Sequence, residues 1–173
     1  SDGSLWGMGG SGYGKLGNGH TNRWNGQVFE KIPFQIESSG VVQASAGAWN
    51  SIYIKSDSSL WAMGANFQGS LGDGTETVRA RPVQILGSEG GVSFVDASWH
   101  SMFIKENGSL WGMGNNSAGQ LGDGSTENRS LPVEIQNFGV IDVDSSVFVK
   151  SNGTIWAMGQ SLFRGAPAKQ TTP

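Results

Sequence analysis

The chain has 173 residues, a formal net charge of −3 and 14% charged residues, against about a quarter in an average soluble domain. Because it is mildly acidic and has no cluster of Lys or Arg, the sequence is a poor electrostatic partner for nucleic acid. The absence of cysteine excludes disulfide frameworks, thiolate nucleophiles and cysteine-ligated zinc. No apolar run approaches the length of a membrane span, so we expect no membrane insertion.

The first predicted element is a strand over 4–9, with the sequence Ser-Leu-Trp-Gly-Met-Gly. It follows an Asp-Gly pair at 2–3, a dipeptide that accepts the positive φ angles of a tight hairpin turn. A Leu-Gly-Asn-Gly turn stands at 16–19, and a Pro-Phe-Gln-Ile run at 33–36. The last run predicts an outer strand, because proline is tolerated at the edge of a sheet.

The second unit contains four predicted strands. Val-Val-Gln-Ala at 41–44 indicates an innermost strand and Ile-Tyr-Ile-Lys at 52–55 a second one, since β-branched and aromatic residues favour strands. A two-residue turn at 57–58 leads into Ser-Leu-Trp-Ala-Met-Gly at 59–64. A Pro-Val-Gln-Ile run at 82–85 closes the unit as its outer strand.

The same order of strings continues to residue 159. In the third unit strands are expected at 92–95, 102–105, 109–114 and 132–135, and in the fourth at 140–143, 147–150 and 154–159. The tryptophans of the four Trp strings, at positions 6, 61, 111 and 156, are 55, 50 and 45 residues apart. No segment shows a convincing 3.6-residue apolar period, so no long helix is expected.

Four short antiparallel strands per unit of 45–55 residues are typical of a β-propeller blade. We therefore predict an all-β fold, a partial propeller of about three repeat units with blades of four antiparallel strands. The units lie near 4–36, 41–86, 92–136 and 140–159 within a repeat region 1–160, and 161–173 is predicted to be a linker or terminal tail.

The loop after the third Trp string carries a family resemblance. The stretch 115–133, Asn-Asn-Ser-Ala-Gly-Gln-Leu-Gly-Asp-Gly-Ser-Thr-Glu-Asn-Arg-Ser-Leu-Pro-Val, resembles a nearly complete repeat of the regulator of chromosome condensation family, and 65–74 is similar. The turn 98–101, Ser-Trp-His-Ser, resembles the family's Gly-x-x-His-Ser/Thr turn. The resemblance is to bacterial-type repeats, and it implies a propeller that usually has seven blades when complete and whose shared activity is recognition.

The sequence departs from that family at one recurrent position. Where the family usually has a second tryptophan, this chain has methionine: Met8, Met63, Met113 and Met158. Methionine fills an apolar gap between sheets less rigidly than tryptophan. The strict recurrence of Trp6, Trp61, Trp111 and Trp156 favours packing between neighbouring blades over a ladder of stacking sites for sugars or bases.

The Leu-Gly-Asp/Asn-Gly strings are interpreted as structural turns. A phosphate-binding loop would need a following Gly-Lys-Ser/Thr, and one acid per loop gives too few oxygen ligands for calcium. Asp73 and Asp123 are instead expected to bond their own backbone. Catalysis is not expected, because the only histidines, His20 and His100, stand in no nucleophile motif, and two histidines make a poor metal site. No metal and no cofactor is predicted.

Some aromatic residues break the repeat and are therefore the candidates for binding. Aromatic side chains on the loops of a rigid β scaffold are typical anchors for a partner. The alternative is that Trp49 and Trp99 only cover the inner ends of their blades. The candidate partner-binding residues are Tyr13, Trp24, Trp49, Phe67, Trp99 and His100.

These observations predict a non-catalytic recognition module that binds a protein partner through loop aromatics. A carbohydrate-binding module, with Trp24, Trp49 and Trp99 as stacking platforms, is one alternative, and an architectural element of a larger surface protein is another. From the bacterial-type resemblance we expect a secreted or cell-surface location. Three or four blades do not close the usual ring, so we expect the open ends to be covered by more blades of the same polypeptide or of another copy.

Overall fold

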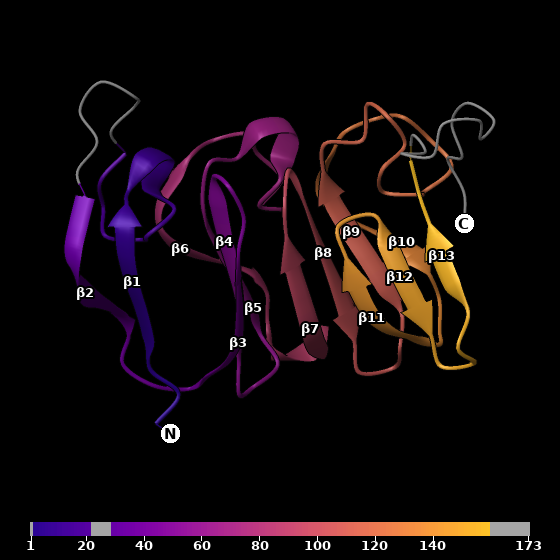
Figure 1. Cartoon of the computed structure of the whole chain (residues 1–173), viewed down its shortest axis with the longest axis horizontal. Coiled ribbons are helices and arrows are strands. Elements are labelled where there is room, and N and C mark those ends of the chain that lie inside the picture. Colours follow the sequence, from indigo (N-terminus) through magenta and orange to yellow (C-terminus); the bar gives the residue numbers. More distant parts are fainter. Residues whose placement is uncertain (1, 22–28, 160–173) are drawn as a thin grey trace.

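A computed structural model describes residues 2–21 and 29–159. In this part of the chain thirteen strands form four antiparallel sheets that stand side by side (Figure 1). The fold is all-β, as predicted. Its helical elements within the described ranges are three single 3-10 turns, at Gly12–Gly14, Phe67–Gly69 and Ser88–Gly90. The tail predicted at 161–173 lies outside the described residues.

The two central sheets each have four strands, arranged in the order of the sequence. One contains β3 (Val41–Ala46), β4 (Asn50–Lys55), β5 (Leu60–Gly64) and β6 (Arg79–Leu86), and the other β7 (Val92–Ala97), β8 (His100–Lys105), β9 (Leu110–Gly114) and β10 (Arg129–Gln136). The N-terminal sheet pairs β1 (Leu5–Gly10) with β2 (Phe29–Glu37). The C-terminal sheet contains β11 (Val140–Asp144), β12 (Val147–Lys150) and β13 (Ile155–Ala157).

Tight turns join the second and third strands, where the sequence predicted them. Ser58 and Gly108 occupy the left-handed region in these turns, with φ of 64° and 77°. The residue before each one closes the turn, since the Oδ1 atoms of Asp57 and Asn107 accept a hydrogen bond from the backbone N–H two residues later, at 3.0 Å. This local bond explains why Asp and Asn recur there.

The outer strands are longer than the proline-led runs suggested. Strands β6 and β10 begin at Arg79 and Arg129, so Pro82 and Pro132 lie inside them. Between Arg129 and Val133 the pairing of β10 with β9 shifts its register, and Pro132 lies within this irregular stretch. A proline is tolerated here because the strand is the outermost of its sheet and one side of it carries no ladder of hydrogen bonds.

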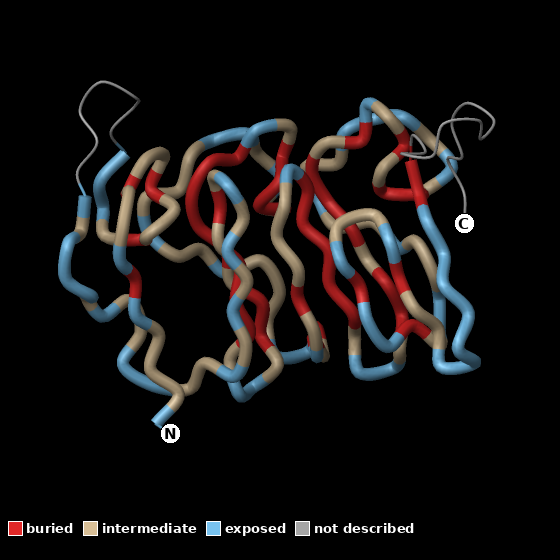
Figure 2. Tube along the Cα trace, viewed as in Figure 1, coloured by how far each residue is buried: buried red, intermediate tan, exposed pale blue. Residues whose placement is uncertain are grey.

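Two hydrophobic core clusters fill the space between the two central sheets and the space between the second central sheet and the C-terminal sheet (Figure 2). In the first cluster Ile52 and Ile54 of β4 lie together with Phe103 of β8, and in the second Met102 of β8 lies with Phe148 of β12. All five side chains are essentially inaccessible to solvent. Strand β8 thus serves two cores, because its alternate residues point to opposite faces of the sheet.

Neighbouring units also contact each other where a methionine side chain packs against a glycine of the preceding unit. We call this contact the methionine-on-glycine joint. A Cβ atom on the second residue of each Leu-Gly-Asp/Asn-Gly loop would collide with the sulfur of the methionine in the next Trp string. The pairs are Gly17 with Met63, Gly72 with Met113, and Gly122 with Met158. The loop of one unit therefore holds the strand of the following one, and glycine is the residue that leaves room for the sulfur.

Hydrogen bonds also link the innermost strands of successive sheets. The Gln43 side chain accepts from the N–H of Val95 at 3.2 Å and donates to its carbonyl at 3.4 Å. Two residues further along, the hydroxyl of Ser45 accepts from Ala97 N–H at 3.0 Å. A polar inner-strand side chain thus reaches the backbone of the following sheet at successive positions.

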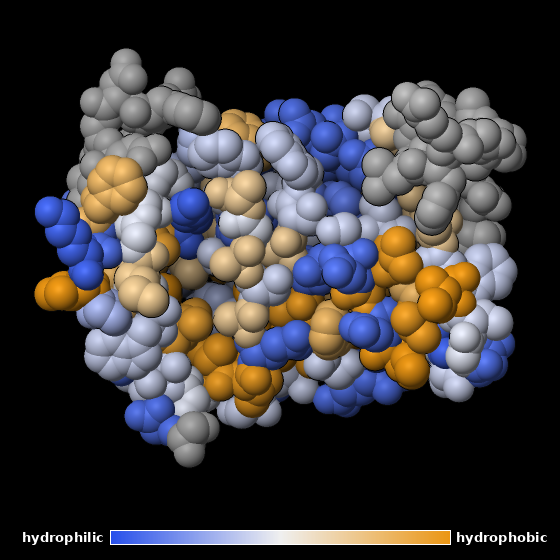
Figure 3. Space-filling view, in the orientation of Figure 1, coloured by the Kyte–Doolittle hydropathy of each residue, from blue (hydrophilic) through white to orange (hydrophobic). Residues whose placement is uncertain are grey.

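The four sheets form an open arc that does not close into a ring (Figure 1). At its N-terminal end Trp6 and Met8 are 53% and 68% exposed, although in the central sheets the corresponding tryptophans are half-buried and the corresponding methionines are buried. On the face drawn in Figure 3, hydrophobic side chains also gather over the lower parts of β3 and β11. Val42 and Ile141, on those two strands, are 65% and 60% exposed. The fold is therefore a section of a β-propeller, as predicted.

Candidate protein-binding surface

One edge of the arc carries two kinds of connection from each central sheet. The turn between the first and second strands and the loop between the third and fourth strands emerge at the same edge, at the top of Figure 1. In the loops after β1 and β5 a 3-10 turn contains one residue with left-handed φ, Tyr13 at 57° and Gln68 at 53°. This conformation is uncommon for a residue other than glycine, and here it fixes the tip of the loop.

Three of the candidate aromatic residues meet at this edge. The ring of Tyr13 lies edge-on to Trp49, with centroids 5.5 Å apart, and also to Phe67, at 5.2 Å. The three rings come from the loop after β1, the β3–β4 turn and the loop after β5, so the cluster connects two sheets. The Lys15 ammonium, on the same loop as Tyr13, donates to the Ala48 carbonyl at 3.1 Å and ties that loop to the turn. We call Tyr13, Trp49 and Phe67 the aromatic cluster.

The other candidates lie in different settings. Trp99, in the β7–β8 turn, is 59% exposed, and Phe67 in the aromatic cluster is 38% exposed, so both rings face solvent. Trp24 lies outside the described residues. Sequence reasoning named the aromatic residues one by one. It could not show that three of them touch, because their loops are far apart in the chain.

His100 lies beneath this edge and is only 5% exposed. Its Nε2 atom is 3.1 Å from the carbonyl oxygen of Ser145 and 3.4 Å from the hydroxyl of Ser146, in the next sheet. Burial lowers the pKa of the imidazole, and this effect outweighs the opposing influence of the Ser145 carbonyl and of Asp96. The neutral ring thus joins two sheets and is covered from any partner, unlike the exposed Trp99 next to it in sequence.

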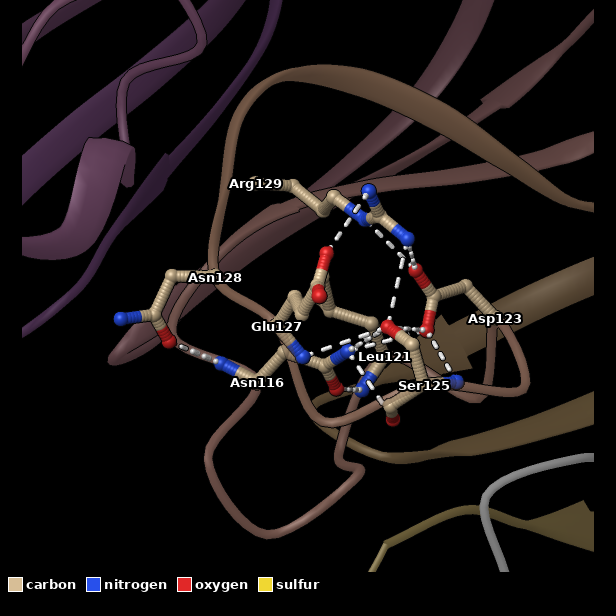
Figure 4. A network of polar contacts seen from close by, with 7 residues as sticks. All are labelled: Asn116, Leu121, Asp123, Ser125, Glu127, Asn128 and Arg129. Atoms are coloured by element: carbon tan, nitrogen blue, oxygen red, sulfur yellow. Dashed lines mark hydrogen bonds and ion pairs between the residues drawn. The ribbon is translucent and has the colours of Figure 1, made fainter.

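The loop between β9 and β10 is held by a buried carboxylate (Figure 4). Asp123 Oδ2 accepts from Nε of Arg129 at 2.7 Å, and Oδ1 accepts from Asn116 Nδ2 at 2.9 Å and from Ser125 N–H at 2.9 Å. Burial alone would raise the pKa of Asp123, but these donors outweigh it and hold the pKa below its usual value. Asp73 makes the same set of bonds in the preceding loop. These turns are structural, as the sequence indicated.

The loop after β1 is also closed by a polar contact between two side chains, but the residues differ from the Asp–Arg pair of the later loops. Asn18 stands where the later loops have aspartate, and Glu30 where they have arginine. The Asn18 amide donates to Glu30 Oε1 at 2.7 Å, so the polar link across the loop is kept without an ion pair. The candidate surface therefore rests on loops whose shape is fixed from below by internal hydrogen bonds.

The Trp strings do not form a binding ladder. In the central sheets Trp61 and Trp111 stack nearly parallel on Tyr53 and Phe103 of the same sheet, at centroid distances of 6.4 and 6.2 Å. The lysine six residues before each tryptophan places its ammonium over the indole, at 4.4 Å for Lys55 and 4.3 Å for Lys105. These two tryptophans are packing residues, and the recurrent lysines are their partners, a role that sequence reasoning missed.

Two kinds of feature are absent from the part of the chain that the structure describes. Within 2–21 and 29–159, no group of three or more His, Asp or Glu residues is placed to hold a metal ion. No helix in the same ranges has both the length and the apolar character needed to cross a membrane.

Comparison with known families agrees with this geometry. The family model for the regulator of chromosome condensation (RCC1) repeat matches residues 2–54 and 107–147, together more than half of the chain. The chain belongs to the RCC1 repeat family. The matched ranges contain the aromatic residues Tyr13 and Trp49 and the hydrogen-bonded loop of Asp123.

Solved structures share the RCC1-type fold. Human WBSCR16 superposes with a TM-score of 0.82 at 18% identity, over 100% of this chain and 47% of that one. Prp20p from Saccharomyces cerevisiae gives a TM-score of 0.68 at 16% identity, over 91% of this chain and 41% of that one. A complex described as Kap60 bound to yeast RCC1 (Prp20) gives 0.67 at 15% identity, over 90% and 40%. The chain spans less than half the length of each, and the likeness shows the fold.

Proposed function

We propose that the chain is a non-catalytic protein-binding module whose contact surface is the edge that carries the aromatic cluster and Trp99. The observation that carries the proposal is the contact of Tyr13 with both Trp49 and Phe67, next to solvent, on loops held rigid by internal hydrogen bonds. Clustered aromatic side chains on a fixed scaffold bind with little loss of conformational entropy, because their rings are already ordered before the partner arrives.

The similar proteins support a protein partner. The yeast structures are described as a complex with Kap60 and in terms of binding to Gsp1p and histones, so members of this fold do bind proteins. The chain carries a net charge of only −3 and no cluster of Lys or Arg, and the exposed rings of Phe67 and Trp99 favour a partner contact dominated by apolar burial.

Two further elements of the proposal concern context. The exposed ends of the arc, such as Trp6 and Met8, support coverage by more blades of the same polypeptide or of another copy.

The resemblance of 115–133 to bacterial-type repeats supports a secreted or cell-surface location. Fractionation of the source cells, followed by immunoblotting, tests the location, and recovery in the cytosolic fraction would contradict it.

The binding surface is tested by comparing two exposed aromatic residues. Trp99→Ala removes a 59% exposed ring at the proposed edge, and Phe138→Ala removes a 66% exposed ring in the β10–β11 connection, which emerges at the opposite edge. Proteins captured by the wild type and by Phe138→Ala, but not by Trp99→Ala, are candidate partners. For a purified partner we expect Trp99→Ala to weaken the Kd by about tenfold or more, and titration calorimetry measures this.

A glycan array with the same two variants separates the carbohydrate alternative from protein binding. Saturable binding of a sugar that is lost in Trp99→Ala and kept in Phe138→Ala would replace the protein proposal. Equal capture of the same proteins by both variants would contradict the assignment of this edge as the binding surface.

A further inference from the structure

Trp49 and Trp99 occupy the same place in the two central sheets. Each directly precedes the first residue of a second strand, Asn50 or His100, in the turn at the proposed binding edge. Their surroundings differ, because Trp49 is half-buried whereas Trp99 is 59% exposed. The loop that approaches each turn from the preceding unit accounts for this difference.

The loops after β1 and β5 dock beside these turns in the same way. The Lys15 carbonyl accepts a hydrogen bond from the Ser51 hydroxyl at 2.9 Å, and the Ser70 carbonyl accepts one from the Ser101 hydroxyl at 2.7 Å. Lys15 and Ser70 therefore hold equivalent positions, each two residues after the left-handed residue of its own loop.

The left-handed residue itself differs between the two loops. It is Tyr13 in the first, with φ of 57°, and Gln68 in the second, with φ of 53°. The Tyr13 ring lies edge-on to Trp49, with centroids 5.5 Å apart and the ring planes at 89°. Gln68 has no ring, and among the described residues no aromatic ring lies against Trp99. The exposed Trp99 therefore lacks the aromatic neighbour that Trp49 has.

A polar contact is missing at the same turn. In the first loop Lys15 Nζ donates to the Ala48 carbonyl at 3.1 Å. In the second loop Ser70 stands in place of the lysine, and its hydroxyl donates to the Ala65 carbonyl of its own loop at 3.2 Å. No side chain within the described ranges donates to the carbonyl of Ser98, the counterpart of Ala48. The second turn thus lacks both the ring and the cationic donor that the first turn has.

The charge of the chain favours a cation as the missing donor. All fourteen Asp and Glu residues lie in the described ranges, against eight of the eleven Lys and Arg. Six of these eight are already engaged on tryptophan rings, carboxylates or carbonyl groups. They are Lys15, Lys55, Arg79, Lys105, Arg129 and Lys150. A partner that brings its own Lys or Arg is therefore attracted to this surface, and an acidic partner is repelled.

We propose that the partner presents an aromatic side chain to Trp99 and a neighbouring Lys or Arg to the Ser98 carbonyl. The ring lies edge-on to Trp99, in the geometry that Tyr13 adopts on Trp49. The cation takes the role that Lys15 has in the first loop. This inference rests on the proposed function and adds to it the chemistry of the partner.

An aliphatic side chain would satisfy the site less completely. Edge-to-face contact between aromatic rings stabilises a complex beyond the area that it buries. An aliphatic group could cover Trp99, but it would also shield the Ser98 carbonyl from water without supplying a donor, which is unfavourable. The combination of a ring with a cation meets both requirements.

The first test fills the site from within the chain. Tyr13 shows that tyrosine is tolerated at this left-handed position, so we expect the new ring in Gln68→Tyr to cover Trp99. The urea midpoint should rise by about 0.3–0.8 M, because an aromatic pair is added. This rise should vanish when Gln68→Tyr is combined with Trp99→Ala. Gln84→Tyr, at an exposed position of β6, is the matched control and should leave the midpoint unchanged.

The second test uses an array of short peptides of varied sequence, probed with the labelled chain. Peptides that bind the wild type but not Trp99→Ala should be enriched in Tyr, Phe or Trp beside Lys or Arg. For the tightest of them, fluorescence anisotropy should show that replacing the aromatic residue of the peptide by Ala weakens the Kd by about tenfold or more. Gln68→Tyr should weaken the Kd by a similar factor, because its own ring occupies the site, whereas Gln84→Tyr should bind like the wild type.

The outcomes distinguish this inference from the proposed function. The partner chemistry is wrong if Trp99-dependent peptides show no enrichment in aromatic residues beside Lys or Arg, or if they bind Gln68→Tyr as tightly as the wild type. It is also wrong if the stability of Gln68→Tyr does not depend on Trp99. In these cases the binding surface itself still stands. An array without any Trp99-dependent peptide would contradict both proposals.

Discussion

Gly72 shows how a single residue determines the packing between units. It has φ of +80°, and a Cβ there would collide with the sulfur of Met113. Gly153, in the turn before β13, has almost the same φ of +83° but nothing within 4 Å of a Cβ position. The two glycines therefore separate backbone strain, which both share, from close packing, which only Gly72 has.

We expect Gly72→Ala to lower the free energy of unfolding by about 2–4 kcal/mol, and Gly153→Ala by only about 1 kcal/mol, the cost of a left-handed alanine. Urea unfolding followed by circular dichroism measures both values. Equal losses in the two variants would mean that the sulfur moves aside and that the joint is not tightly packed.

At the residue scale the sequence indicated the structural role of several residues, but it did not indicate which residues touch one another. It correctly predicted structural turns at Asp73 and Asp123, since both recur with the repeat. It predicted that the tryptophans pack between neighbouring blades, whereas Trp61 and Trp111 stack on a ring of their own sheet. It did not predict that Met113 packs on Gly72, because the two residues are 41 positions apart and meet only when neighbouring sheets stack. Methionine was interpreted as a loose substitute for tryptophan, and the glycine opposite each sulfur explains why it fits.

The contact between the β7–β8 turn and the next sheet depends on a neutral histidine. His100 is buried and has a pKa below its ordinary value of 6.5, first because burial disfavours the charged ring. The unfolded chain binds a proton as the pH falls through about 6.5, whereas the folded chain does so only at lower pH. Stability that is present above pH 6.5 is therefore lost as the pH decreases.

We expect the urea midpoint of the wild type to fall between pH 7 and about pH 5, before most carboxylates titrate. The first central sheet has asparagine, Asn50, at this position, so His100→Asn should fold and should remove most of the decline in that interval. His20→Asn, at an exposed loop position, is the control and should keep the wild-type profile. An unchanged slope in His100→Asn would assign the pH dependence to other groups.

Elements were predicted well where the signal is local. The Asn-Gly turns and the β-branched second strands gave the hairpins, because both depend on neighbouring residues. The extent of the outer strands was underestimated, since proline suggested a beginning and the strand in fact starts at Arg79 or Arg129. These arginines bind Asp73 and Asp123 at the base of the loop, a contact that extends the strand beyond the reach of a sequence pattern.

For the whole molecule, stability follows from which sheets have neighbours. The second central sheet lies between both core clusters, the first central sheet and the C-terminal sheet each border one of them, and the N-terminal sheet borders neither. In such repeat architectures stability is approximately a sum of unit terms and nearest-neighbour interface terms. The end sheets of the described chain should therefore open before the central sheets do.

Hydrogen exchange followed by mass spectrometry tests this. We expect amides in β4, β5, β8 and β9 to exchange slowest, and those in β2 and β13 to exchange fastest, by about two orders of magnitude or more. Uniform protection across all four sheets would show instead that the arc opens as one cooperative unit.

The overall architecture was predicted from the fixed order of strings, and the comparisons confirm the family. The candidate surface was predicted only in part: the aromatic residues were named, but the contacts of Tyr13 with Trp49 and Phe67, and the burial of His100, depend on how separate loops converge. Such convergence leaves no periodic pattern in a single sequence. For this reason the exposed Trp99 and the buried His100 were both predicted to bind a partner.

The methionine-on-glycine joint has an evolutionary consequence. Each joint uses one residue from a loop and one from the following strand, and the pairs Gly17–Met63, Gly72–Met113 and Gly122–Met158 are chemically identical. A gene that loses or duplicates one unit by unequal recombination would therefore restore the same joint at the new boundary, without any compensating mutation. The joint itself therefore sets no limit on the number of units that can follow one another.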